Sequence, residues 1–178
     1  HTVPMIAVSV SLPAGSVYDP PNKPGLAALA AYLFNEGAGN LRSTAYQDEL
    51  ARRAIQLSLS PERDYFTLSF VSLSANAKDA FQLIALALQR PRFDADAIVR
   101  VRAQMLQSLI QENEDPEAVA SRRFYETFFA GHPYAREVGG TAQGLNAISA
   151  ADLKVFARVH WVRGGVKIAV AGDIDAAA

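Results

Sequence analysis

Three stretches in which apolar residues recur at every second position constrain this chain more than any other feature. A period of two puts alternate side chains on one face of a β-strand, so each stretch predicts a half-buried strand or hairpin. The stretches are residues 4–12, residues 55–73 with a turn over 61–64, and residues 166–171. Strands at both ends of the chain and a hairpin in its middle indicate one mostly antiparallel sheet.

The segments between these strands have helical spacing and recognisable helix ends. Thr44 with Gln47, and Ser149 with Asp152, have the spacing of capping boxes, and Pro116 fits the first turn of a helix. The expected helices are residues 25–36, 44–53, 77–89, 94–113, 116–129 and 149–160. Helices inserted between antiparallel strands predict an α+β fold, with the sheet packed against a layer of helices. We expect residues 1–178 to form one domain.

Length and charge exclude several classes of function. The chain has 178 residues, and 17 basic against 18 acidic side chains leave a net charge of −1. This balance argues against a nucleic-acid partner and against a polybasic membrane patch. No apolar stretch is long enough to span a bilayer, and the absence of cysteine excludes disulfides and thiolate chemistry. Because the chain opens at His1 without an initiator Met, we expect it to be a piece of a longer protein.

The sequence contains no evident reaction centre. None of the three histidines, His1, His132 and His160, has a second histidine or a carboxylate at helical ligand spacing, so local hydrogen bonding is the simpler interpretation. The carboxylates between Glu112 and Glu117 fall where one helix ends and another begins, and acidic residues near a helix start are expected from the helix dipole alone. No Gly-x-Ser-x-Gly elbow is present.

A series of short motifs, each weak alone, resembles the insulinase (pitrilysin) family of inverted-motif zinc peptidases when the motifs are taken in order. The resemblance covers nearly the whole chain. The motifs are Pro13-Ala14-Gly15-Ser16, Pro24-Gly25-Leu26-Ala27, Arg63-Asp64, Asp115-Pro116, Gly131-His132-Pro133-Tyr134, the apolar set Ile148, Leu153 and Phe156, and Val170-Ala171-Gly172-Asp173.

The catalytic positions of that family are degenerate here. In active members the zinc helix reads Gly-Leu-x-His-x-x-Glu-His, in which the histidines bind zinc and the glutamate activates water. The resemblance places Ala28 and Tyr32 at the histidines and Ala31 at the glutamate. A later glutamate, which completes the metal site, falls near Gln107 or Ser108. Alanine has no donor atom and tyrosine is a poor zinc ligand at neutral pH, so the resemblance implies no metal, no cofactor and no catalysis by this chain alone.

The substrate strand of the family has changed as well. Active members bind peptide along an edge strand that carries an Asn-Ala pair before the hairpin turn. Ser58 and Leu59 occupy these places, and Pro61 follows. Leu59 is bulkier than alanine and Pro61 lacks a backbone donor, so peptide pairing is expected to be weaker. A turn proline without any bearing on binding is the alternative.

Subunits of this family contain two similar halves, and this chain is more similar to the first. Its His-Pro-Tyr loop and closing Gly-Asp strand match that half, and the Arg-Gly-Leu-x-Tyr signature of second halves is missing. The resemblance therefore implies a non-catalytic subunit that pairs with a zinc-bearing homologue and helps to enclose a peptide substrate. By analogy with bacterial relatives it implies the periplasm or cell envelope.

Two other hypotheses remain open from the sequence. One is an active metallopeptidase whose ligands lie outside this chain. The other is a scaffold or assembly subunit without a role in proteolysis, like the core subunits of respiratory complexes.

Overall fold

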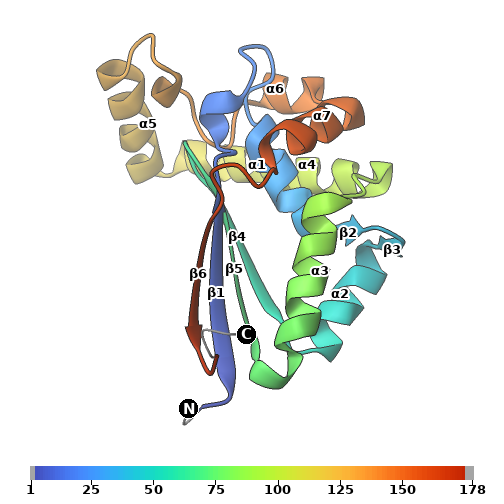
Figure 1. The fold of residues 1–178 in the computed structure, drawn as a ribbon. Coiled ribbons are helices and arrows are strands. Elements are labelled where there is room, and N and C mark those ends of the chain that lie inside the picture. The colour runs from blue at the N-terminus through green and yellow to red at the C-terminus, as the bar shows by residue number, and fades with distance from the viewer. Residues whose placement is uncertain (1–2, 175–178) are drawn as a thin grey trace.

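Four strands form one antiparallel sheet in the order β4-β5-β1-β6 (Figure 1). The computed structural model describes residues 3–174. The strands are β1 (Met5–Leu12), β4 (Gln56–Pro61), β5 (Phe66–Leu73) and β6 (Lys167–Gly172). Every neighbouring pair is antiparallel, with Val8 opposite Phe70 and Val170 on the two sides of β1. The α+β fold with a mostly antiparallel sheet, as expected from the alternation, is confirmed.

The two faces of the sheet differ in chemistry because the strands alternate. One face carries the buried side chains of the two central strands, including Val8, Leu68 and Phe70. The opposite face carries hydroxyls that bond across strands, Ser11 to Thr67 at 3.0 Å and Ser69 to Ser9 at 3.3 Å. This pattern is typical of an antiparallel sheet that is packed on one side only.

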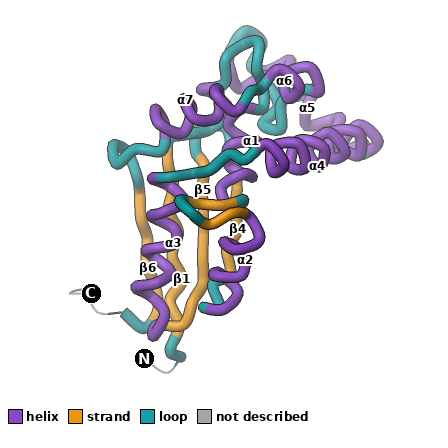
Figure 2. The backbone as a smooth tube through the Cα atoms, turned by 90° about the vertical axis from the view of Figure 1, so that its right-hand side faces the viewer, coloured by secondary structure: helices purple, strands orange, loops and turns teal. Residues whose placement is uncertain are grey.

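The helices form two groups around the sheet (Figures 1 and 2). The helices α2 (Ser43–Arg52) and α3 (Ala77–Gln89) lie along one face of the sheet. The others gather at the end of the sheet opposite the N-terminus. They are α1 (Leu26–Tyr32), α4 (Ala95–Glu114), α5 (Pro116–Phe128), α6 (Ala142–Ala147) and α7 (Ala150–His160). No helix within residues 3–174 combines the length and apolar character needed to cross a membrane.

Helix α1 lies at the centre of the second group. It contacts α4, α6, α7 and the edge strand β4, and its residues from Leu26 to Ala31 are all buried. Its four alanines let these neighbours approach closely because they add little side-chain volume. Beside it an aromatic cluster of Phe34, Phe66, Phe93 and Trp161 joins the helices to the sheet, with ring centroids 5.8–5.9 Å apart.

Several local expectations need correction. The α-helix predicted over 25–36 ends at Tyr32 and tightens into a 3₁₀ turn, Leu33–Asn35. The capping box predicted at Thr44 and Gln47 is wrong, because α2 begins at Ser43 and the Gln47 side chain donates to Asn35 O at 2.9 Å. The structure also adds α6 and a two-residue ladder of β2 (Gly37–Ala38) and β3 (Leu41–Arg42).

The other capping predictions are confirmed. Ser149 and Asp152 form a reciprocal capping box at the start of α7. Pro116 occupies the first turn of α5, where Asp115 accepts a hydrogen bond from Glu117 N at 3.0 Å.

Candidate functional site

A buried carboxylate fixes the start of α1. The side chain of Asp19 accepts hydrogen bonds from Gly25 N at 2.7 Å and from Ala27 N at 2.8 Å, so it caps the helix from the segment that precedes it. Burial raises the pKa of Asp19 to about 6, against the lowering effect of these two bonds. Gly25 has a φ of +98°, which favours glycine, and Arg136 holds the loop by donating to Asp19 O at 2.7 Å. Sequence reasoning missed Asp19, and no motif marks it.

The degenerate catalytic positions separate into two environments. Ala28 and Ala31 are fully buried inside the helical group, whereas Tyr32, one residue further along α1, is 41% exposed. On α4, Ser108 lines the same cavity as Tyr32, while Gln107 is exposed and does not line it. The structure therefore brings Tyr32 and Ser108 together and leaves Gln107 outside.

This cavity, which we call the α1–α4 cavity, has a volume of about 470 Å³ and lies between α1, α4 and β4. One part of its lining is apolar, and the rest consists of amides, hydroxyls and two carboxylates. The lining residues are Tyr32, Asn35, Glu36, Leu59, Val101, Gln104, Met105, Ser108, Leu109, Glu112 and Gly139. The pKa of Tyr32 is raised by burial and, in addition, by the negative charge of Glu112.

The outer edge of β4 borders this cavity and carries unpaired backbone groups. Glu62 N donates to Tyr65 O at 2.9 Å, so these two residues form a hydrogen-bonded pair at the tip of the hairpin. Because such pairs alternate with non-bonded pairs along an antiparallel ladder, Ser58 bonds to β5, whereas Leu59 and Pro61 direct their backbone groups outward. No strand within residues 3–174 pairs with this edge.

The two substrate-strand candidates therefore lie on opposite faces. The side chain of Leu59 lines the cavity, and that of Ser58 is exposed on the other face of the sheet. Pro61 belongs to β4, opposite Phe66, and the turn follows it instead of spanning 61–64. Pro61 is thus a strand residue and not a turn residue, and the N–H that it lacks would have faced the free edge. Its effect on peptide binding stays a prediction.

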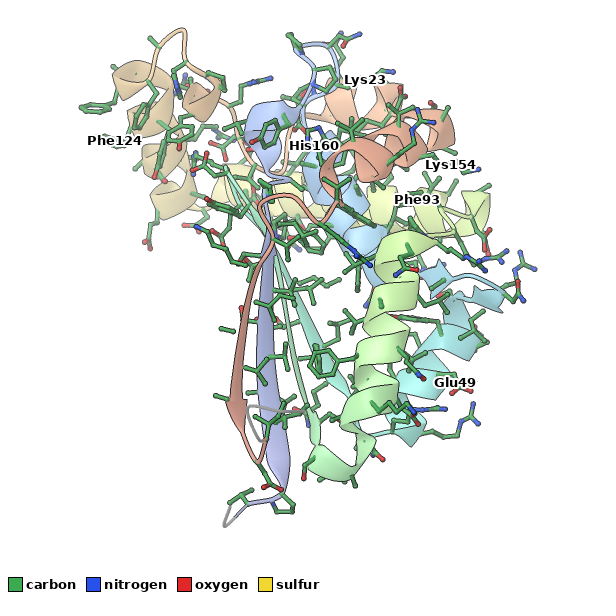
Figure 3. The ribbon with its side chains drawn as sticks, viewed as in Figure 1. Lys23, Glu49, Phe93, Phe124, Lys154 and His160 are labelled. Atoms are coloured by element: carbon green, nitrogen blue, oxygen red, sulfur yellow. The ribbon has the colours of Figure 1, made fainter. Side chains whose placement is uncertain are left out.

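The residues present do not fit a zinc ion. Among residues 3–174, no group of three or more His, Asp or Glu side chains is close enough together to hold a metal. His132 Nδ1 accepts a hydrogen bond from Tyr134 N at 3.2 Å. His160, labelled in Figure 3, packs against Tyr18 and Phe156, where burial lowers its pKa. His1 lies outside the described residues.

Two relatives carry names that describe members without peptidase activity. The chain is 27% identical, over 98% of its length and 40% of the relative, to a "non-peptidase homolog YmxG" of Helicobacter pylori. A crystal structure of a peptidase M16 inactive domain from Pseudomonas fluorescens superposes with a TM-score of 0.91 at 28% identity, and covers 97% of this chain and 42% of that one. Both names describe peptidase-like proteins without that activity.

A third relative is a subunit of a respiratory complex, cytochrome b-c1 complex subunit 1 of Bos taurus, which is 24% identical over 97% of this chain and 36% of its own length. The chain thus spans about two fifths of the length of the relatives it matches. The family model of insulinase, peptidase family M16, matches residues 1–142. The resemblance to a degenerate first half is confirmed: the chain belongs to the insulinase family of peptidases, M16.

Proposed function

We propose that this chain is the first half of a non-catalytic subunit which pairs with a zinc-bearing homologue and holds peptide substrate for it. The observation that carries the proposal is the α1–α4 cavity. It remains open beside a free strand edge, although the positions of the zinc ligands and the catalytic glutamate on α1 hold two buried alanines and Tyr32, and Tyr32 alone of these lines the cavity. A degenerate site with no remaining role would gain stability from being filled.

Each part of the site has a role in this proposal. The outward backbone groups of Leu59 pair with the main chain of an extended peptide, in the manner of an added β-strand. The cavity receives a side chain of that peptide. Ala31 has no group to activate water, so the bond-breaking step belongs to the partner. Residues 1–178 then act as one wall-forming domain of a longer, two-domain subunit.

The relatives support a partnership of this kind. One is named as subunit 1 of the cytochrome b-c1 complex, and another, from Arabidopsis thaliana, as a probable mitochondrial-processing peptidase subunit beta at 24% identity over 94% of this chain. Both names describe parts of assemblies with several subunits. A zinc-bearing homologue with an intact His-x-x-Glu-His helix is the partner that this chain would complement.

The test mixes the full-length subunit with such a homologue and measures complex mass and the rate of peptide cleavage. We expect a complex whose rate or peptide-length preference differs from that of the homologue alone. Leu59→Arg, which fills the cavity, is expected to abolish the change in rate. Ser58→Arg, one residue away on the opposite face, is the matched control and keeps it. Absence of a complex together with an unchanged rate would refute the proposal.

The same experiment separates the two other hypotheses. The similarity to a cytochrome b-c1 complex subunit favours a scaffold, which would form a complex without changing cleavage. An active metallopeptidase with ligands elsewhere in the longer protein would hold zinc after dialysis and cleave peptide alone in a chelator-sensitive way.

A further inference from the structure

The lining of the α1–α4 cavity has a charge pattern that the proposed function does not explain. The described lining residues include two carboxylates, Glu36 and Glu112, and no cationic side chain. Glu36 is already neutralised, because Arg100 and Ser43 both bond to its Oε2. No cation within residues 3–174 forms an ion pair with Glu112. The cavity therefore presents one carboxylate, Glu112, that is exposed to solvent and has no ion-pair partner among the described residues.

Much of the remaining lining is apolar. Leu59, Val101, Met105 and Leu109 form that part of the lining, and the amides of Asn35 and Gln104 lie among the polar remainder. A long side chain with an aliphatic stem and a cationic head matches this arrangement, because the stem can pack on the apolar part while the head meets the carboxylate. A purely apolar side chain would cover these polar groups without satisfying them.

The free edge of β4 determines where such a side chain enters. Leu59 directs both its N–H and its C=O outward, so an antiparallel peptide residue opposite it exchanges two hydrogen bonds with it. Side chains of directly opposed residues lie on the same face of a sheet. The side chain of that peptide residue is therefore placed on the face of Leu59, beside the cavity. Pro61 has no N–H to offer the next pair, which limits the pairing to Leu59 and the residues before it.

We propose that the α1–α4 cavity selects peptides with a lysine or arginine at the position paired with Leu59, and that Glu112 is the residue that recognises the cationic head. This inference rests on the proposed function, since it assumes a peptide on the β4 edge. It gives the α1–α4 cavity, which has no catalytic group, a preference for one class of peptide sequence.

The test measures binding of the full-length subunit to fluorescein-labelled nine-residue peptides by anisotropy. The peptides alternate Val and Ser and carry arginine, citrulline or norleucine at the centre. We expect the arginine peptide to bind about fivefold more tightly than the other two, as one partly exposed charge pair allows. The preference is expected to decrease at high salt.

Two variants test whether Glu112 is the residue that recognises the cationic side chain of the peptide. Glu112→Gln is expected to remove the preference and to leave affinity for the norleucine peptide unchanged. Glu114→Gln, which removes the same charge from an exposed position outside the cavity, is the matched control and keeps the preference. Equal binding of the three peptides by the unmodified protein would overturn the inference while leaving the proposed function standing. No binding of any peptide would overturn both.

Discussion

The two edges of the sheet offer the same backbone groups but lie in different surroundings. Along β4 every second residue is partly buried, because Leu57 and Leu59 pack against the helical core. Along β6 all six residues are exposed, and Ile168 reaches 62% although it lies on the face that α3 covers elsewhere. The two edges therefore differ in the packing of their side chains and not in the backbone groups that they offer.

What distinguishes β4 is the support behind it. Helix α1 contacts β4 directly and α4 adds the second wall, so a peptide on this edge would meet a preformed cavity. Ile168 and Val170 of β6 also border cavities, of about 480 and 1130 Å³, that they share with side chains of α3 such as Phe81, yet they remain 62% and 39% exposed. The edges therefore differ in the packing of their own side chains, which are partly buried at alternate positions of β4 and exposed throughout β6.

The largest expected effect comes from placing a larger, charged side chain in the buried face of α1, the helix that packs against β4. Ala31→Glu places a carboxylate in a fully buried position without a partner, and an uncompensated buried charge costs about 3–5 kcal/mol. We expect a loss of about 4 kcal/mol in the free energy of unfolding, measured with urea. Tyr32→His, one residue further on the same helix but exposed, is the control and should stay within about 0.5 kcal/mol. Equal losses in the two variants would contradict the burial argument.

A pH-dependent effect of comparable size is expected from Asp19, which fixes the start of α1. Because its pKa is raised from 3.8 to about 6 in the folded protein, the folded state keeps a proton that the unfolded state has released. Its contribution to stability is fully present below pH 3.8 and is lost as pH rises through about 6, by roughly 3 kcal/mol in total at 1.36 kcal/mol per pKa unit.

The measurement is urea unfolding of the full-length protein at a series of pH values between 4 and 7. Asp19→Asn does not titrate, so its curve should lack this part of the pH dependence. If the variant and the unmodified protein change in parallel across the window, another group is responsible.

The difference between the two sheet edges is tested most directly by shortening one aliphatic side chain to alanine on β4 and one on β6. Leu59→Ala removes partly buried apolar contacts, and we expect a loss of about 1–2 kcal/mol, below the range for fully buried leucines. Ile168→Ala removes a side chain that is mostly in water and should cost less than about 0.5 kcal/mol. Thermal unfolding of the two variants side by side checks this. A larger loss at Ile168 would show that β6 is covered in the full-length protein.

Much of the fold could be predicted from the sequence, because the period of two at the strands and the caps at the helix ends are local signals. The Ser149–Asp152 box is an example, since both bonds lie within four residues. The predictions were wrong where contacts between residues far apart in the chain determine the local structure. Gln47 has the spacing of a cap, but it donates to Asn35 O instead, a partner twelve residues away that no local pattern reveals.

The site could be predicted only in part for the same reason. The order of motifs located Tyr32 and Ser108, which the structure places in one cavity. Asp19 caps α1 across six and eight residues, a spacing that matches no common capping motif. The proposed role of Glu112 depends on packing between segments far apart in the chain. For Glu112 the local signal was misleading, because a carboxylate between two helices is explained by the helix dipole.

The smallest expected effect concerns Pro61, the residue that shortens the free edge of β4. Its ring nitrogen faces outward, so Pro61→Ala adds one N–H to the edge without removing a bond to β5. One additional hydrogen bond contributes about 0.5–1.5 kcal/mol, and we expect peptide affinity to rise about twofold, as the lower end of this range gives. Anisotropy with the norleucine peptide measures this gain, because that peptide has no cationic side chain to interact with Glu112. The control is Ser60→Ala, the preceding residue, whose backbone bonds to β5 and not to the edge. An equal gain from Ser60→Ala, or none from Pro61→Ala, would show that peptide does not pair with β4 at this point.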